Sequence, residues 1–244
     1  MSNQKLYSWD ISKSQKKPKK LPTVFSKGNP NNVLIIGDIH EPFCLEGYLE
    51  FCREQQEKFN CGKIVFIGDI IDNHYSSYHE TDPDGYSAGE EFERAYDKVQ
   101  NWYKVFPEAI VLTGNHDRLI ARKAYSAGIS QVWIRSLKDT LNTTNWNFVE
   151  EYEYLDVLYM HGEGGTARTK MKKELQSIVQ GHLHTQAYIE YIVGKHYKIF
   201  GFQVGCGIDK DAYAMAYAKR FPKPIISCGV VLNGQLPILL PMNL

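Results

Sequence analysis

The feature that most constrains this chain is an apolar run at residues 63–67, followed at once by Gly68-Asp69-Ile70-Ile71-Asp72. A run of β-branched and aromatic side chains of this length predicts a buried strand, and the glycine after it permits a sharp turn. The two aspartates come just past the carboxyl end of that strand, where open α/β sheets place their ligands. The stretch therefore predicts an α/β sheet with a polar site along one edge.

Two further apolar runs, at residues 32–36 and 109–112, predict buried strands on either side of the first. The stretches between them, residues 45–58 and 88–106, have helical character. Ser87 is expected to cap the second helix, because Glu90 stands at the third position beyond it as in a capping box. Strands that alternate with helices indicate βαβ units and a mainly parallel sheet.

The second half of the chain changes character. Helices are expected near residues 118–125, 131–141 and 167–175, and strands at residues 154–160 and 177–180. Turns at Gly194-Lys195 and Asn233-Gly234 predict two hairpins, formed by residues 187–202 and 225–240. These hairpins are expected to add an antiparallel sheet. The predicted fold class is α/β, a two-sheet mixed β-sandwich flanked by helices in four α/β/β/α layers.

Length and charge divide the chain into an arm and one domain. Residues 1–31 form a basic, flexible N-terminal arm, and residues 32–244 form a single domain. Residues 1–32 hold seven lysines and one aspartate, about +6 in a chain of net charge zero, so the body is acidic. An acidic body disfavours binding to many phosphates at once. The arm is either a solvated tail or a contact for nucleic acid or an acidic partner.

Composition also bears on the compartment. No apolar stretch approaches the roughly 20 residues that span a bilayer, and no secretory signal is visible, so no membrane partner is expected. Five cysteines without Cys-x-x-Cys spacing are typical of reduced thiols. We therefore expect a cytoplasmic protein. The oligomeric state stays open.

Polar residues recur at the predicted strand ends, each time after an apolar run and close to a glycine. They include five of the eight histidines of the chain. A single segment of this kind could be only a capped turn, but five in one chain indicate a shared site. The set consists of Asp38, His40, Asp69, Asp72, Asn115, His116, Asp117, His161, His182 and His184.

Imidazoles and carboxylates without a thiolate suit Mn²⁺, Fe²⁺, Zn²⁺ or Mg²⁺. The number of candidate ligands exceeds what one tetrahedral zinc requires, which indicates two metal ions. Ions about 3.5–4 Å apart share a carboxylate, and such pairs clamp phosphate and activate water. The residues thus point to hydrolysis of a phosphate ester, with an aminopeptidase-type site as the alternative.

Five motifs resemble the calcineurin-like metallophosphoesterase superfamily, and they occur in the order of that family. They are Asp38-x-His40, Gly68-Asp69-x-x-Asp72, Gly114-Asn115-His116-Asp117, His161-Gly162 and Gly181-His182-x-His184. The resemblance is specific for the superfamily and leaves the subfamily open. It implies a two-sheet α/β sandwich with the site at the strand ends.

The resemblance also implies roles for individual residues. Two divalent ions are implied, with Mn²⁺ preferred over Fe, Zn or Mg, and a hydroxide that bridges them attacks phosphorus. His116 would protonate the leaving oxygen, and Asp72 would hydrogen-bond that histidine. Asp117 is either part of the site or a first-turn acid of the next helix. The implied ligands are Asp38, His40 and His184 for one ion, Asn115, His161 and His182 for the other, and Asp69 between them.

Residues near the site suggest how substrate could be held. His74, with Tyr75, Tyr78 and His79 after it, is a possible substrate contact, unless this loop packs on its own tyrosines. Arg118 is a second possible contact, unless it faces solvent.

The motif also departs from that of the protein serine/threonine phosphatases. Those enzymes usually carry Arg-Gly after the second aspartate, where this chain has Asn73-His74. We therefore expect a phosphatase or phosphodiesterase acting on a small, nucleotide-type substrate. The alternatives are a nuclease that binds DNA or RNA through its basic arm, a protein phosphatase, and a non-catalytic metal-binding scaffold.

Overall fold

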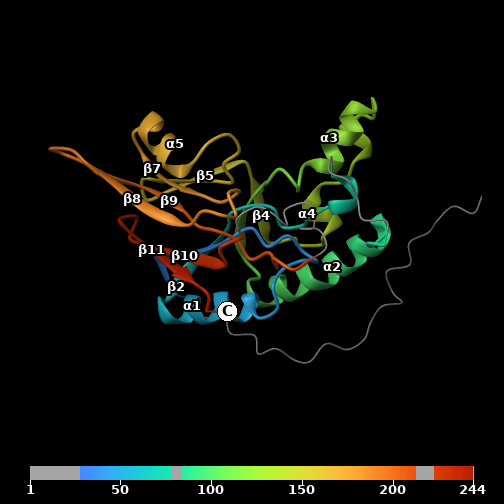
Figure 1. Cartoon of the computed structure of the whole chain (residues 1–244), viewed down its shortest axis with the longest axis horizontal. Coiled ribbons are helices and arrows are strands. Elements are labelled where there is room, and N and C mark those ends of the chain that lie inside the picture. Colours follow the sequence, from blue (N-terminus) through green and yellow to red (C-terminus); the bar gives the residue numbers. More distant parts are fainter. Residues whose placement is uncertain (1–27, 78–83, 213–222, 244) are drawn as a thin grey trace, which may run out of the picture.

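A computed structural model describes residues 28–77, 84–212 and 223–243. Two sheets pack face to face, with helices on the outer face of each (Figure 1). The first sheet has the order β11-β10-β1-β2-β3-β4 and the second the order β5-β6-β7-β9-β8. This arrangement confirms the predicted α/β class and its two-sheet sandwich. The strands are β1 (Asn29–Ile36), β2 (Cys61–Phe66), β3 (Ala109–Leu112), β4 (Trp146–Val149), β5 (Glu151–Tyr154), β6 (Val157–Met160), β7 (Ser177–Gln180), β8 (Tyr188–Val193), β9 (Lys198–Gln203), β10 (Ser227–Leu232) and β11 (Leu236–Pro241).

The first sheet has a parallel centre, as the alternation of strands and helices predicts. β1 pairs with β2, β2 with β3 and β3 with β4, all in parallel. The chain enters this sheet at Asn29, which pairs with Cys61, so β1 begins before residue 32. Residues 1–27, most of the predicted basic arm, lie outside the described residues.

Both predicted hairpins form, but the separate antiparallel sheet that we expected from them does not. The hairpin β10–β11 joins the first sheet, because β10 lies antiparallel to β1. The hairpin β8–β9 joins the second sheet through a parallel pairing of β9 with β7. That sheet is therefore mixed. A turn signal fixes how two neighbouring strands pair, while the sheet edge that they join depends on the packing of distant parts of the chain.

Two short strands, β4 and β5, had no predicted counterpart, and the strand expected at residues 154–160 begins only at Val157. β5 and β6 form a hairpin whose turn residues, Leu155 and Asp156, have φ angles of 52° and 59°. Glycine and asparagine dominate at such positions, so this turn carries no recognisable sequence signal. The sequence did not predict this hairpin because its two turn residues are unusual for such a turn.

Helices cover the outer faces of both sheets. Ser87 caps α2, since its hydroxyl accepts a hydrogen bond from the Glu90 amide at 3.3 Å, as predicted. The single helix expected at residues 131–141 is wrong. The chain forms η3 and then α4, because Ser136 adopts an extended conformation and caps a new helix. The helices are α1 (Tyr48–Lys58), η2 (His74–Ser76), α2 (Ala88–Val105), α3 (Leu119–Ser126), η3 (Gln131–Trp133), α4 (Leu137–Thr140) and α5 (Ala167–Glu174). Among the described residues, no helix is long and apolar enough to cross a membrane.

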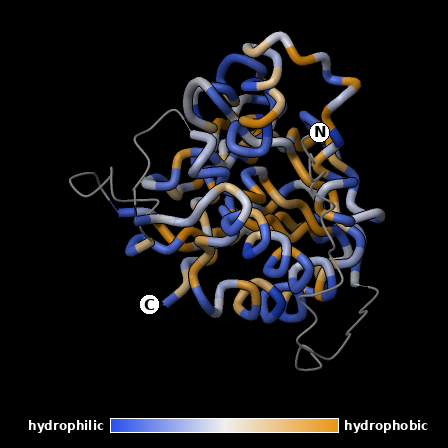
Figure 2. Tube along the Cα trace, turned by 90° about the vertical axis from the view of Figure 1, so that its right-hand side faces the viewer, coloured by the Kyte–Doolittle hydropathy of each residue, from blue (hydrophilic) through white to orange (hydrophobic). Residues whose placement is uncertain are grey.

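The core has two parts, one on each face of the first sheet. Phe66 and Trp102 belong to the part beneath α1 and α2, whereas Val65 and Tyr159 belong to the part between the sheets. Hydrophobic residues accordingly concentrate on the inner strands (Figure 2). Alternate side chains of β2 enter opposite parts of the core, which explains why its sequence reads as one continuous apolar run. Strands buried on both faces hold their ends in fixed positions, and these ends carry the polar site.

Candidate metal centre

The structure brings together the polar residues that follow five different strands. Asp38 and His40 follow β1, and Asp69 and Asp72 follow β2; Asn115 and His116, His161, and His182 and His184 follow β3, β6 and β7. Three of these strands belong to the first sheet and two to the second. The site thus lies where the ends of both sheets meet. Each residue predicted as a metal ligand lies in this group.

A first cluster consists of Asp38, His40, Asp69 and His184, with ligand atoms all within 4.8 Å of one another. The Nε2 atoms of His40 and His184 are 3.0 Å apart. The Nε2 atom of His184 lies 3.2 Å from Asp38 Oδ2, and that of His40 lies 3.6 Å from Asp69 Oδ2. Two carboxylates and two imidazoles at these distances make a set of donors around one point.

A second cluster consists of Asp69, His161 and His182, again within 4.8 Å. His161 Nε2 lies 3.2 Å from Asp69 Oδ2 and 2.9 Å from Asn115 Oδ1. The amide oxygen of Asn115 therefore joins this cluster. Asp69 belongs to both clusters, which is the position expected for a carboxylate shared by two ions.

Two imidazoles of the clusters, those of His161 and His40, form hydrogen bonds through their Nδ1 atoms. His161 Nδ1 donates a hydrogen bond to the carbonyl of Ile67 at 3.0 Å, and His40 Nδ1 lies 2.6 Å from Asp72 Oδ1. Each bond fixes the tautomer and leaves the Nε2 lone pair directed into the cluster. Metal-ligating histidines are oriented by partners of this kind.

Asp38 provides a direct test of whether the clusters fit a metal. Its side chain is buried, and Oδ1 has no hydrogen-bond partner, whereas Oδ2 accepts from the His182 amide at 2.7 Å. A buried carboxylate oxygen without a partner is costly, and a cation beside it removes that cost. The donors of both clusters are carboxylate, imidazole and amide groups, which suit Mn²⁺, Fe²⁺, Zn²⁺ or Mg²⁺. The residues therefore fit divalent ions.

Glycines in the motifs make room for the ligands. A Cβ atom on Gly114 would overlap the carboxylate of Asp69, and one on Gly181 would overlap that of Asp38. Each of these glycines precedes one ligand and lies against a ligand from another strand. At these two positions the glycine serves close approach between segments of the chain.

Three ligands have left-handed backbone conformations: φ is 48° at His40, 47° at Asp69 and 67° at His182. Non-glycine residues rarely adopt these angles, and each costs on the order of 1–3 kcal/mol. The buried strands before them and the contacts around them hold the backbone there. Such strain concentrates at functional sites.

Charges within the clusters are strongly coupled. Burial alone would raise the pKa of Asp69, but His161, His116 and His40 hold it well below its usual range. Burial alone would lower the pKa of His161, but Asp69 and Asp38 raise it to about 10. Without metal, the imidazole of His161 is therefore protonated at neutral pH beside the Asp69 carboxylate. Binding of a divalent ion at His161 would release that proton.

Asp72 and His116 differ from the expected pairing. The Asp72 carboxylate bonds His40 and lies 3.5 Å from His116 Nδ1. His116 Nδ1 instead donates to the backbone carbonyl of Asp72 at 2.5 Å. The backbone geometry of this loop brings the carbonyl nearer than the carboxylate. The pKa of His116 is nonetheless raised, because the charges of Asp69 and Asp72 outweigh burial.

The two predicted substrate contacts are engaged by the protein. His74 is buried, with its ring edge-on to Phe43 and its Nδ1 atom 3.9 Å from Asp72 Oδ2. His74 therefore supports the loop from within, whereas the sequence left open either a substrate contact or a loop packed on its own tyrosines. Tyr75 is exposed, and Tyr78 and His79 lie outside the described residues.

Arg118 also lies in a different setting from either prediction. Its guanidinium donates to Glu163 at 2.6 Å, to Glu150 at 2.5 Å and to the Thr113 carbonyl at 2.7 Å. Two carboxylates therefore neutralise its charge. Neither a phosphate contact nor a solvated arginine describes this position.

Asp117 has a structural role that the sequence left open. Its carboxylate accepts hydrogen bonds from the amides of Ile70 and Gly114, both at 2.9 Å, and so ties the loop after β2 to the loop after β3. Burial and the nearby charge of Asp69 raise its pKa to about 7. Asn73, which the sequence marks only as a departure from the protein phosphatases, donates to the His116 carbonyl at 3.0 Å. Asp117 stands within the Gly114-Asn115-His116-Asp117 motif, and the sequence left only its role open.

Clusters of aspartate and histidine at the strand ends of this two-sheet α/β fold are compatible with a divalent metal site. The chain belongs to the calcineurin-like phosphoesterase family, whose sequence profile matches residues 32–201. No curated protein matches the chain.

Solved structures similar to this chain include nuclease MPE from Pseudomonas putida, at 13% identity over 86% of this chain and 87% of that one, with a TM-score of 0.40. The phosphoesterase YfcE from E. coli is 17% identical over 87% of this chain and 100% of its own, with a TM-score of 0.37. Vacuolar protein sorting 29 from Cryptosporidium parvum is 12% identical over 90% and 100%, with a TM-score of 0.42.

Proposed function

We propose that this protein hydrolyses phosphoester bonds with two divalent metal ions, Mn²⁺ preferred, and that its substrate is a small phosphomonoester or phosphodiester of nucleotide type. The observation that carries the proposal is the place of Asp69 in both ligand clusters. Asp38, His40 and His184 would hold one ion with it, and Asn115, His161 and His182 the other. Two bound ions supply an activated water and neutralise phosphate oxygens.

His116 is the residue that we assign to proton transfer. Its Nδ1 atom is bonded to the Asp72 carbonyl, so Nε2 is the nitrogen that can reach the leaving oxygen. Its raised pKa keeps a larger fraction of the imidazole protonated at neutral pH, as a general acid requires. Its side chain is 22% exposed, more than those of the buried ligands beside it.

The charge around the centre supports a substrate with few phosphates. Arg118 stands directly after Asn115-His116-Asp117, but Glu150 and Glu163 neutralise it. The body of the chain is acidic as well, which opposes the binding of many phosphates near the metals. A single nucleotide-type ester needs only the ions themselves to balance its charge.

The test is an assay of the Mn²⁺-loaded protein on monoesters, diesters, cyclic nucleotides, phosphopeptides and single-stranded DNA. The His116→Ala protein serves as the background control. Hydrolysis of nucleotide-type esters that depends on both Mn²⁺ and His116 supports the proposal. Preference for phosphopeptides would contradict the substrate class, and no hydrolysis by a protein with both metals bound would favour a scaffold.

A further inference from the structure

One segment of the chain combines cationic side chains with exposed aromatic ones. Residues 119–138 contain four cationic side chains and no acidic one, in a chain whose net charge is zero. The cations are Arg122, Lys123, Arg135 and Lys138. The segment comprises α3, η3 and the start of α4, and we call it the basic–aromatic surface.

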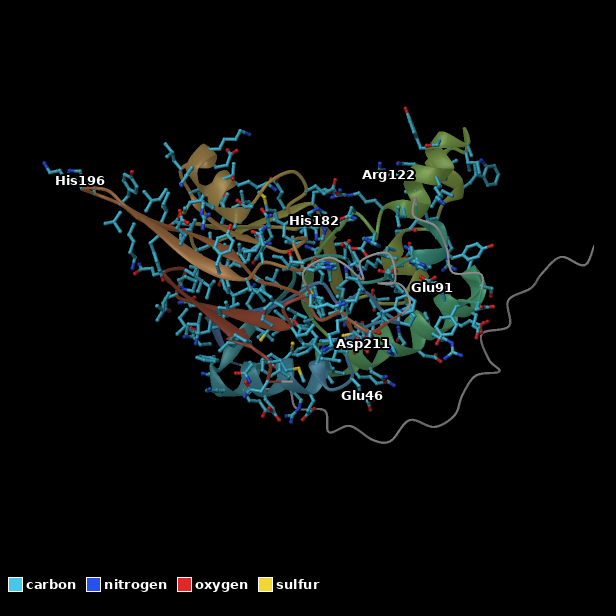
Figure 3. The ribbon with its side chains drawn as sticks, in the orientation of Figure 1. Glu46, Glu91, Arg122, His182, His196 and Asp211 are labelled. Atoms are coloured by element: carbon cyan, nitrogen blue, oxygen red, sulfur yellow. The ribbon has the colours of Figure 1, made fainter. Side chains whose placement is uncertain are left out.

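The same segment exposes large apolar and aromatic side chains. Tyr125 is 78% exposed, Val132 83% and Trp133 80%. Arg122 and Arg135 are exposed too, and Figure 3 shows Arg122 on α3 in the upper right of the molecule. Large apolar side chains exposed together on one short segment are typical of a binding surface for a ligand or a macromolecule.

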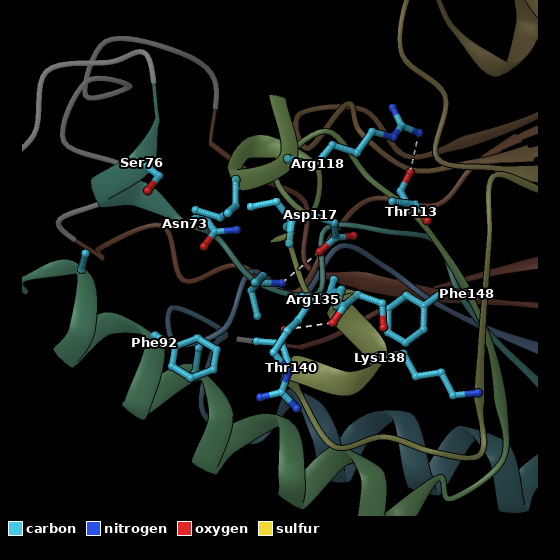
Figure 4. Close-up of a pocket in the computed structure, with 18 of the residues that line it drawn as sticks. Asn73, Ser76, Phe92, Thr113, Asp117, Arg118, Arg135, Lys138, Thr140 and Phe148 are labelled. Carbon is cyan, nitrogen blue, oxygen red and sulfur yellow. Dashed lines mark hydrogen bonds between the residues drawn. The ribbon is translucent and has the colours of Figure 1, made fainter. Parts of the chain in front are cut away.

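The basic–aromatic surface follows a motif of the metal centre along the chain. α3 begins directly after the motif that contains Asn115 and His116. On its inner side, Gln131 and Arg135 line a cavity of about 560 Å³ that Asn73 and Asp117 also line (Figure 4). A ligand that lies on this surface can therefore extend along the protein to the residues that support His116.

Cations interleaved with exposed aromatic rings suit one class of ligand. Single-stranded nucleic acid offers phosphates to the cations and unpaired bases that stack on aromatic side chains. Charge complementarity thus favours a polyanion with planar groups.

We propose that the basic–aromatic surface binds single-stranded nucleic acid, with Trp133 and Tyr125 as stacking platforms, and leads a phosphoester of the strand to the metal centre. This inference rests on the proposed function and extends its nucleotide-type substrate to a strand. The neighbouring nucleotides would lie on the cations of residues 119–138, away from the acidic body.

The experiment measures binding of the metal-loaded protein to a fluorescent phosphorothioate oligothymidine, which resists hydrolysis, by fluorescence anisotropy. Trp133→Ala and Tyr125→Ala should each weaken binding at least about fivefold, as removal of a stacking platform for one base does. The matched control is Tyr197→Ala, which removes a 51% exposed aromatic ring from the β8–β9 hairpin and should leave binding unchanged.

Charge reversal tests the role of the cationic side chains of this surface. Arg122→Glu combined with Arg135→Glu should weaken binding and flatten its salt dependence, because fewer phosphates of the strand are neutralised. The slope of log K against log salt should change by about 0.7 for each such phosphate of a single strand. Lys104→Glu, an exposed lysine on α2, is the control. All variants keep the basic arm, so its contribution is common to them.

Three results would overturn the inference: no oligonucleotide binding by the wild type, binding that Trp133→Ala leaves intact, or equal binding of duplex DNA. A wild-type dimer that Trp133→Ala converts to monomer would assign the surface to self-association instead. Hydrolysis of a small chromogenic diester by the wild type is measured in parallel. If that activity is present while strand binding is absent, only the inference fails and the proposed function stands.

Discussion

At the scale of single residues, His40 shows how one side chain of the centre depends on others. Its Nε2 atom faces Asp69 and His184, its Nδ1 atom bonds Asp72, and its backbone is left-handed. Asp72 therefore positions a metal ligand as well as supporting His116 through its carbonyl. Substitutions at these positions should separate metal binding from proton transfer.

His116→Ala should lower the rate of ester hydrolysis by roughly 10²–10⁴ and leave the metal content intact. The reason is that His116 is absent from both ligand clusters that contain Asp69. Metal analysis beside steady-state kinetics checks this. Unchanged turnover would contradict the role of His116 as proton donor.

Asp69→Asn should reduce occupancy of both sites together with activity, because its carboxylate belongs to both clusters. Metal content by mass spectrometry is the measurement. Asp156→Asn, an exposed acid in the β5–β6 turn, is the matched control and should bind metal normally. Full occupancy of both sites in the Asp69 variant would contradict the shared carboxylate.

At the scale of elements, the site is assembled from loops that nearly touch. Asp117 fastens the loop after β2 to the loop after β3, and Gly114 allows those loops to approach. The two strands that precede these loops, β2 and β3, are short, buried and paired in parallel. Fixed strands with close-packed loops hold the ligands in place before metal arrives.

Gly114→Ala should abolish metal binding while the domain remains folded. A methyl group there overlaps the Asp69 carboxylate and its backbone, so the loop must move and carry Asn115 with it. Circular dichroism and metal titration check both parts. Gly128→Ala is the control: open space surrounds that glycine, and the positive φ of 72° should cost only about 1 kcal/mol of stability. Normal metal affinity in Gly114→Ala would contradict the crowding argument.

At the scale of the whole molecule, the metal centre joins the two sheets. His161 and His182 follow strands of the second sheet, and Asp69 and Asn115 follow strands of the first. Ligands from both sheets should therefore couple metal binding and protonation to the stability of the entire domain.

The metal-free protein should lose stability as pH rises from 6.5 toward 10. The pKa of His161 is raised to about 10 by Asp69 and Asp38, against about 6.5 in the unfolded chain. Its stabilising contribution is thus complete below pH 6.5 and disappears as pH rises through 10. The free energy of unfolding measured with urea should be lower at pH 8.5 than at pH 6.5 by on the order of 1–3 kcal/mol. His161→Gln should show a smaller difference, and an equal difference would assign the pH dependence to other groups.

Divalent metal should raise the stability of the domain and its chelation should lower it. Ions that bind only the folded state add about 2.7 kcal/mol at one hundred times their dissociation constant. Thermal unfolding with Mn²⁺ and with chelator measures the change. The Asp38→Asn protein, which lacks the charge of the carboxylate whose Oδ1 has no hydrogen-bond partner, should show a smaller shift. An equal shift would place the stabilising ion elsewhere.

The sequence by itself determined most of the strands that precede the site and the candidate ligands that follow them. Each motif is local: a buried strand, a glycine and a donor side chain follow one another within a few residues. The tertiary structure decided the partners. Only it shows that Asp72 bonds His40, that His74 is buried, that Arg118 is neutralised and that Asp117 joins two loops. The physical reason is that local sequence sets strand propensity and side-chain chemistry, whereas hydrogen-bond partners, sheet edges and burial depend on segments brought together from distant parts of the chain.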